Sequence, residues 1–186
     1  MVPLNIPNVL TVIRILLVPV LVVALLEKTG GGDLLAAVVF AVASVTDAID
    51  GRLARSRNAV TTFGKLMDPI ADKLLVMAAL IALVSLNRLE AWVAMVIIAR
   101  EFAVTVLRVA AGTQQGVVIS ASAFGKLKTA VQVAMVMVLI AVHGRPVWVD
   151  LLVYVTVLIT VLSGADYFFG ASRRRVEPGA AARVNR

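Results

Sequence analysis

Long apolar segments, interrupted by short polar stretches, run through most of the chain. Each segment has about the length of a helix that crosses a bilayer, which needs roughly 20 residues. The segments cover approximately residues 8–27, 34–54, 66–86, 90–111, 119–142 and 147–169. This pattern predicts an all-α integral membrane protein with six transmembrane helices.

The polar stretches between the segments contain glycine, proline and charged residues, which favour turns. Three consecutive glycines lie in the first stretch, at 30–32, and Gly144 and Pro146 lie in the last. A polar stretch over 52–65 separates the second and third segments, and Asn87-Arg88 predicts a tight turn before the fourth. The end of the chain is rich in arginine and poor in apolar residues. We therefore expect one six-helix domain over residues 1–171 and a basic, flexible cytoplasmic tail over residues 172–186.

The composition supports membrane insertion. Hydrophobic residues make up 61% of the 186 residues, and the mean hydropathy is +0.98, whereas a soluble domain is about 45–50% apolar. The excess must face lipid, and no length remains for a separate soluble domain. Because Arg14 lies inside the first apolar segment and no Lys or Arg precedes it, we interpret this segment as a span and not as a cleavable signal.

The basic residues predict the orientation. Only three of the eighteen lysines and arginines, Lys28, Arg88 and Arg145, lie in the first, third and fifth connections. The positive-inside rule therefore places both termini and the even-numbered connections in the cytoplasm. Trp92 and Trp148 then lie near the outer interface. The net charge of +7 follows from this topology, and no nucleic-acid recognition motif accompanies it.

The absence of cysteine excludes disulfides, thiolate nucleophiles and cysteine-bound zinc. His143 is the only histidine in the sequence, so a site with several histidine ligands is excluded as well. Any metal must be held mainly by carboxylates. That ligand type is typical of hard cations such as Mg²⁺ or Mn²⁺.

Four aspartates form two pairs at helical spacing. Asp47 and Asp50 are near the cytoplasmic end of the second segment, and Asp68 and Asp72 are near the cytoplasmic start of the third. Separations of three and four residues place side chains on one helix face. Four converging carboxylates would repel one another, and each charge is costly near a bilayer. Divalent cations would relieve that repulsion, and two of them could bridge a pyrophosphate.

Structural alternatives remain open for these residues and their neighbours. Solvation, or pairing with Arg52, Arg55 or Lys73, would account for one or two of the aspartates but not for two pairs. Gly51, Ala54 and Gly64 could simply permit close helix packing. Arg55 could serve as a positive-inside anchor.

The same residues resemble the signature of the CDP-alcohol phosphotransferase family, D-x2-D-G-x2-A-R-x8-G-x3-D-x3-D. Every specified position and gap is satisfied. The matching residues are Asp47, Asp50, Gly51, Ala54, Arg55, Gly64, Asp68 and Asp72.

Members of this family move a substituted phosphate from a CDP-linked donor to an acceptor hydroxyl and release CMP. The resemblance implies that the four aspartates bind two Mg²⁺ or Mn²⁺ ions, through which Asp47, Asp50 and Asp68 also contact the CDP group. It implies that Asp72 is the general base and that Arg55 binds the pyrophosphate. The resemblance assigns the cytidine side to three small residues, Gly51, Ala54 and Gly64. It also implies a homodimer.

The implied chemistry agrees with the residues present. A positioned carboxylate can remove the proton of the attacking hydroxyl, and in-line displacement depends on positioning more than on covalent chemistry. No serine, cysteine or histidine nucleophile is evident. We therefore expect direct transfer, without a phosphoryl-enzyme intermediate.

Basic residues in the fourth and fifth segments predict an acceptor pocket. Arg100 and Arg108 lie on roughly one helix face, and Lys126 and Lys128 begin the fifth segment. Charge within a membrane segment indicates function, and such a group of donors suits a phosphate. The alternative is a structural ion pair between Arg100 and Glu101.

Three further stretches resemble the family members that join CDP-diacylglycerol to sn-glycerol 3-phosphate in phospholipid biosynthesis. They contain Asn5-Ile6-Pro7-Asn8 with Thr11 and Arg14, then Arg100-Glu101-Phe102 with Arg108, and finally Gly125-Lys126 with Lys128-Thr129 and Gln132. Asn8 and Thr11 are candidates for contacts near the nucleotide, although both could instead cap the first helix. Inositol phosphate or phosphatidylglycerol as acceptor remains an alternative.

A different class of function is a small cation transporter, which six spans and intramembrane charge would permit. The aspartates lie at the cytoplasmic edge instead of the midplane, however, and no second half repeats them. A protein without catalytic activity would leave four costly carboxylates unexplained. The sequence therefore favours a transferase in the cell membrane whose active site faces the cytoplasm.

Overall fold

The computed structural model describes the backbone of residues 6–27, 31–57, 62–115 and 123–175, and the side chains of 11–27, 31–46, 73–107 and 124–167. Six α-helices account for most of this part of the chain. They are α1 (Ile6–Leu26), α2 (Gly32–Arg57), α3 (Thr62–Ser85), α4 (Ala91–Gln115), α5 (Ala123–Ala141) and α6 (Val147–Arg175). The prediction of six helices in this order is confirmed.

Two helices extend further into the polar stretch 52–65 than its composition suggests. α2 continues to Arg57 and α3 begins at Thr62, so only residues 58–61 separate them. The length of the apolar segment determines how much of the helix can contact lipid, but the helix itself can continue beyond the segment. Arginine, leucine and alanine all favour helix, and the backbone hydrogen bonds continue beyond the last apolar turn.

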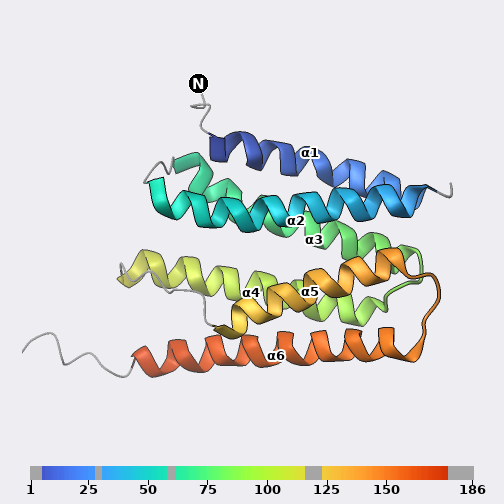
Figure 1. Ribbon diagram of the computed structural model, residues 1–186. Coiled ribbons are helices and arrows are strands. Elements are labelled where there is room, and N and C mark those ends of the chain that lie inside the picture. The colour runs from blue at the N-terminus through green and yellow to red at the C-terminus, as the bar shows by residue number, and fades with distance from the viewer. Residues whose placement is uncertain (1–5, 28–30, 58–61, 116–122, 176–186) are drawn as a thin grey trace, which may run out of the picture.

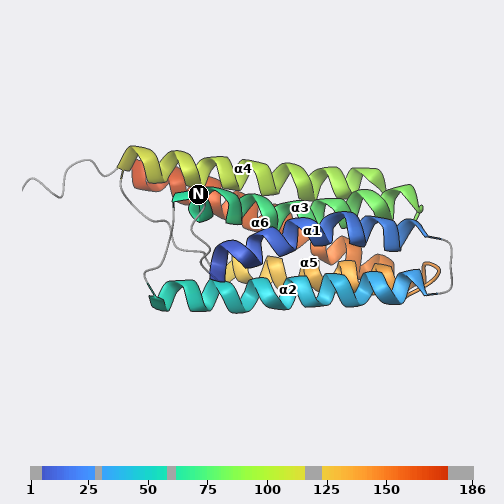
Figure 2. The ribbon, with the colours of Figure 1, turned by 90° about the horizontal axis from the view of Figure 1, so that it is seen from above.

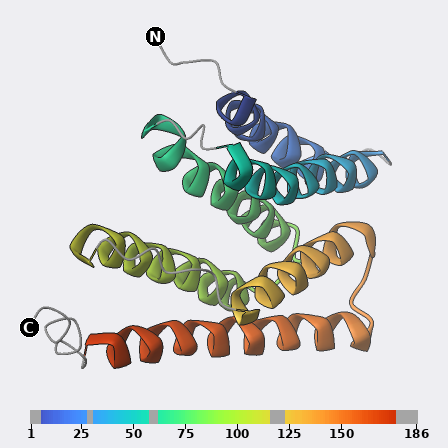
Figure 3. The ribbon, with the colours of Figure 1, turned by 60° about the vertical axis from the view of Figure 1, so that its left-hand side comes forward.

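The helices form an elongated bundle in two groups. α1 packs against α2 and α3, while α6 packs against α4 and α5. Figure 3 shows the first three helices on one side and the last three on the other. Contacts of α5 with α2 and α3, and of α4 with α3, join the two groups.

The connections alternate between the two ends of the bundle. The α1–α2, α3–α4 and α5–α6 connections lie at one end, and the last turns of α2, α4 and α6 lie at the other (Figures 1 and 2). Trp92 and Trp148 are near the first of these ends, in the opening turns of α4 and α6. This arrangement is the one that the distribution of basic residues requires.

The apolar side chains divide into a core and an outward face. Phe40, Leu80 and Ile97 are among the fully buried side chains where the helices meet, whereas Leu16 and Leu151 are among the exposed ones. Within the residues described, α5 and α6 each contain a stretch long and apolar enough to cross a membrane, at Phe124–Ala141 and Val147–Tyr167. Shorter apolar stretches occupy three other helices, at Thr11–Leu26, Gly32–Thr46 and Lys73–Ser85.

Two tight turns begin and end helices at the first end of the bundle. A Cβ atom on Gly32 would lie 2.5 Å from the carbonyl oxygen of Ala24, so only glycine allows this close approach of α2 to α1. α3 ends with Asn87 at φ 55°. The Arg88 amide donates to the Leu83 carbonyl and the Asn87 amide to the Val84 carbonyl, a Schellman motif. The predicted Asn87-Arg88 turn is confirmed.

Ion pairs connect the three turns at this end. Arg88 donates from both terminal nitrogens to the Asp33 carboxylate at 2.8 Å each, and the Nε2 atom of His143 lies 2.6 Å from the same carboxylate. The hydrogen bond from Arg88 holds the pKa of Asp33 below its usual value. Nearby, a hydrogen bond to Asp150 raises the pKa of Arg145. These contacts fix the end of the bundle opposite the aspartates.

Candidate active site

The four aspartates lie on two consecutive helices that run in opposite directions. Asp47 and Asp50 belong to α2, and Asp68 and Asp72 to α3; Figure 1 shows the two helices antiparallel. At about 1.5 Å per residue, Asp47 and Asp72 are each about 15 Å along their helix from its end at Arg57 or Thr62. Asp50 and Asp68 are each about 10 Å from those ends. Asp47 and Asp72 are thus about equally far along their own helices from the α2–α3 connection, and so are Asp50 and Asp68.

The side-chain chemistry of the four aspartates fits a divalent cation. Four carboxylates on two helices supply the oxygen ligands that Mg²⁺ and Mn²⁺ prefer. Their side chains lie outside the described set, and within that set no group of three or more acidic or histidine side chains could hold a metal. The assignment of a metal to the four aspartates therefore stays a prediction from the sequence.

The other residues of the signature lie close to the same helix ends. Gly51, Ala54 and Arg55 are in the last turns of α2, and Gly64 is in the first turn of α3. Their side chains are also outside the described set. The matching positions of the motif therefore gather around the α2–α3 connection, at the end of the bundle that the charge distribution assigns to the cytoplasm.

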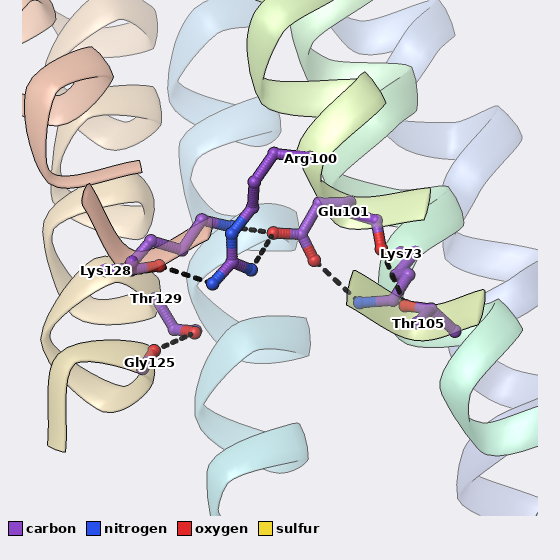
Figure 4. Close-up of polar contacts among 8 residues, drawn as sticks. Lys73, Arg100, Glu101, Thr105, Gly125, Lys128 and Thr129 are labelled. Carbon is purple, nitrogen blue, oxygen red and sulfur yellow. Dashed lines mark hydrogen bonds and ion pairs between the residues drawn. The ribbon is translucent and has the colours of Figure 1, made fainter. Parts of the chain in front are cut away.

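A cluster of charged side chains surrounds Glu101 of α4. The Nζ atom of Lys73 on α3 lies 2.6 Å from Oε2 of Glu101, and Nη1 of Arg100 lies 3.2 Å from Oε1. Lys128 of α5 donates to the same Oε1. Figure 4 shows Glu101 between Lys73 on one side and Arg100 and Lys128 on the other. We call these four residues the basic cluster.

The basic cluster is poorly exposed to solvent. The side chain of Lys128 is 4% exposed and that of Glu101 13%. Three cationic side chains and one carboxylate meet here, and poorly exposed charges of this kind need partners of opposite sign. Lysine and arginine N–H groups are donors of the type that suits a phosphate with several acceptor oxygens.

The basic cluster is adjacent to the aspartates. Lys73 directly follows Asp72 in α3, so the last aspartate is within one turn of a member of the cluster. Through Lys73, the aspartate-bearing part of α3 is connected to α4 and α5. A molecule bound at the cluster would thus be close to the backbone of Asp72.

Two of the four predicted acceptor residues meet in this cluster. Arg100 and Lys128 share Glu101, so the suggested Arg100–Glu101 pair does exist, as one part of a larger network. Lys126 is exposed, because residues two apart lie on different faces of a helix. Arg108 belongs to α4, and its side chain is outside the described set.

Lys73 and Ser163 join the site without having been predicted as part of it. Sequence reasoning considered Lys73 only as a partner for the aspartates, although its position directly after Asp72 was a usable signal. Ser163 of α6 is fully buried and accepts a hydrogen bond from Nη2 of Arg100. An uncharged residue in an apolar segment carries no comparable signal.

The two candidates on the first helix lie within α1. Thr11 is buried, and α1 begins at Ile6, so the interpretation of Thr11 as a helix cap is wrong, since a cap residue precedes the first turn. Asn8 is also inside the helix, with its side chain outside the described set. Arg14, one turn beyond Thr11, is buried as well. α1 therefore presents polar side chains to the interior near the aspartate end.

Further buried polar side chains line α5 and α6. Gln132 lies one turn beyond Lys128, and Thr156 and Thr160 precede Ser163 on α6. The Thr156 hydroxyl donates to the Leu152 carbonyl at 2.7 Å. In the portion of the chain with described side chains, the Thr160 hydroxyl and the Gln132 carbonyl oxygen have no hydrogen-bond partner.

Comparison with known proteins identifies relatives that match most of the helical region. The family model described as CDP-alcohol phosphatidyltransferase matches residues 4–162. The CDP-diacylglycerol--glycerol-3-phosphate 3-phosphatidyltransferase of Bacillus subtilis (strain 168) is 44% identical over 183 residues, covering 88% of this chain and 93% of the relative.

Two further relatives carry related names. The "Probable phosphatidylglycerophosphate synthase" of Mycobacterium tuberculosis (strain CDC 1551 / Oshkosh) is 43% identical, covering 91% of this chain and 82% of the relative. A CDP-diacylglycerol--glycerol-3-phosphate 3-phosphatidyltransferase of Rickettsia felis is 34% identical, covering 88% and 93%. The likeness therefore extends over nearly the full length of each protein.

Proposed function

This chain belongs to the CDP-alcohol phosphatidyltransferase family, and from that premise we propose that it transfers the phosphatidyl group from CDP-diacylglycerol to sn-glycerol 3-phosphate. The products are phosphatidylglycerophosphate and CMP. The names of the relatives support this acceptor. The structural observation that carries the proposal is the basic cluster around Glu101, next to the helix of Asp68 and Asp72.

The donor binds at the aspartate end of α2 and α3. Arg55 holds the pyrophosphate, because its planar fork of donors suits phosphate oxygens, and Gly51, Ala54 and Gly64 leave space for the cytidine. Asn8 and Thr11 approach the nucleotide from α1. The family generally uses a divalent metal, which Asp47, Asp50, Asp68 and Asp72 would hold. Bound ions supply charge neutralisation at the pyrophosphate and at the departing CMP oxygen.

The reaction is a direct displacement at the phosphorus that carries the diacylglycerol. Asp72 takes the proton of the acceptor hydroxyl, and the resulting oxygen forms a new bond to phosphorus. The bond from that phosphorus to the oxygen of CMP breaks, and CMP leaves with the electron pair. Arg55 stabilises the charge that develops on the leaving group.

The acceptor phosphate binds at the basic cluster. Arg100 and Lys128 approach it from α4 and α5, and Lys73 from α3, while Arg108 and Lys126 contribute to the surrounding positive potential. A bound phosphate would compete with the Glu101 carboxylate for the same N–H donors. When no acceptor is bound, Glu101 stays paired with these cations, and this pairing lowers the free-energy cost of their burial.

The protein is a six-span enzyme of the cell membrane, with a single domain over 1–171, a basic tail over 172–186, and its active site toward the cytoplasm. Support for this orientation comes from the connections, which alternate between the two ends of the bundle as the positive-inside rule requires. A homodimer is the oligomeric state that family membership implies.

An acceptor panel tests the proposal. Purified protein in detergent micelles receives CDP-diacylglycerol, Mg²⁺ or Mn²⁺, and one acceptor at a time, and both CMP and lipid product are measured. We expect product with sn-glycerol 3-phosphate. Product with inositol phosphate or phosphatidylglycerol alone would instead indicate a phosphatidylinositol phosphate synthase or a cardiolipin synthase. Absence of CMP release with every acceptor would contradict the whole assignment.

A further inference from the structure

The last helix contacts the acceptor pocket through Ser163 and Gly164. Nη2 of Arg100 donates to the hydroxyl of Ser163, which is fully buried. At the next residue, a Cβ atom added to Gly164 would lie 3.3 Å from Cγ of Arg100. One residue therefore binds the end of the arginine side chain, and its neighbour leaves space for the stem.

These contacts restrict the guanidinium from two directions. Its Nη1 atom donates to Glu101 and its Nη2 atom to Ser163. A guanidinium is planar and rigid, with five donors in a fixed fork. One bond stays within α4, to Glu101, and the other reaches α6, at Ser163. Together they define the plane of the guanidinium and the direction of its other N–H groups.

We propose that Ser163 and Gly164 are positioning residues that orient Arg100 toward the acceptor phosphate. The inference rests on the proposed role of the basic cluster. It adds α6 to an acceptor pocket that the sequence assigned to the fourth and fifth segments. Ser163 acts only through Arg100 and makes no contact with the reacting atoms.

The test measures the KM for each substrate separately. Ser163→Ala removes the acceptor of the Nη2 bond, and we expect the KM for sn-glycerol 3-phosphate to rise about tenfold, the lower end of the effect of losing a hydrogen bond to a charged group. The KM for CDP-diacylglycerol should not change. Ser163→Thr keeps the hydroxyl and should restore much of the acceptor affinity. Gly164→Ala displaces the arginine stem and should raise the same KM.

Thr160→Val is the matched control. Thr160 is buried on the same helix, and in the part of the chain whose side chains are described its hydroxyl has no partner. Valine has a similar shape, so the acceptor KM should be unchanged. An equal rise with Thr160→Val, or a rise in both KM values with Ser163→Ala, would indicate general packing damage and overturn the inference.

A double-mutant cycle separates this inference from the proposed function. If Ser163 acts through Arg100, Ser163→Ala should have little further effect in an Arg100→Lys background. Additive effects would overturn the inference while leaving the acceptor pocket in place. If Arg100→Lys itself leaves the acceptor KM unchanged, the assignment of Arg100 to the pocket fails. If wild-type protein does not use sn-glycerol 3-phosphate, the proposed function fails.

Discussion

Lys73 on α3 and Glu101 on α4 form an ion pair, with 2.6 Å between Nζ and Oε2. The pair joins the helix that carries Asp68 and Asp72 to the helix that carries Arg100. Because Glu101 also accepts from Lys128 of α5, one carboxylate connects three helices. The relative position of the α3 segment that carries Asp68 and Asp72 and of the basic cluster therefore depends on this residue.

Glu101→Gln should destabilise the protein and weaken acceptor binding. The substitution leaves Lys73, Arg100 and Lys128 close together without their shared carboxylate. Breaking a buried ion pair on one side typically costs roughly 3–5 kcal/mol, so a clear fall in Tm is expected in detergent. Glu27→Gln, at an exposed position near the end of α1, is the control. Equal Tm values for the two variants would show that Glu101 has no such role.

Lys128→Met should raise the KM for sn-glycerol 3-phosphate more than Lys126→Met. Lys128 is buried and pairs with Glu101, whereas Lys126 is exposed to screening by water and salt. We expect about a tenfold or greater rise for Lys128→Met and a smaller one for Lys126→Met. Initial rates over a range of acceptor concentrations measure the difference. A larger effect at Lys126 would shift the pocket toward the outer face of α5.

Asp72→Asn should nearly abolish transfer, while CDP-diacylglycerol should still bind. Loss of a general base typically reduces the rate about 10²–10⁴-fold. Asparagine keeps the size of the side chain but cannot take the proton of the acceptor hydroxyl. Single-turnover CMP release and a separate measurement of CDP-diacylglycerol binding check this expectation. Near-normal turnover in the variant would refute the assignment of Asp72 as base.

Removal of divalent cations should stop the reaction. After treatment with EDTA we expect no CMP release, and addition of Mg²⁺ or Mn²⁺ should restore it, because carboxylate ligands select hard cations. Asp50→Asn and Asp68→Asn should shift the restoring metal concentration upward. Full activity in EDTA would exclude the metal assignment for the four aspartates.

The contribution of Asp33 to stability should disappear in acid. Asp33 is in the first turn of α2, at the end of the bundle opposite the aspartates, and the hydrogen bond from Arg88 lowers its pKa. A carboxylate with a lowered folded-state pKa stabilises the fold above its unfolded pKa of about 4, and this stabilisation is lost as the pH falls through the folded value. The Tm difference between wild type and Asp33→Asn should thus be present at neutral pH and vanish in strong acid. A difference that is constant with pH would contradict this linkage.

Several parts of the site were predictable because they depend on local spacing. The three- and four-residue separations of the aspartates are read directly from the sequence, and the antiparallel course of α2 and α3 follows from the order of the apolar segments. The Asn87-Arg88 turn was predictable for the same reason. The predicted helix ends were less accurate, since α2 and α3 continue as helix beyond their apolar segments.

The basic cluster was only half predictable. The sequence predicts a functional role for Arg100 and Lys128 because they are charges in apolar segments. Their partner residues, however, do not follow from the spacing. Lys126 and Lys128 have the same charge and nearly the same position in the sequence. Only the packing of α5 decides that Lys128 is buried and Lys126 exposed.

The sequence by itself determined the membrane class, the six helices and the aspartate pairs, because each of these depends on composition or on helical periodicity; the orientation is its prediction from the basic residues. The tertiary structure decided which side chains meet around Glu101 and Arg100. Lys73 and Lys128 are 28 and 27 residues from Glu101, and Ser163 is 63 residues from Arg100. No helical repeat relates residues at such separations. Their contact depends on which faces of α3, α4, α5 and α6 pack together.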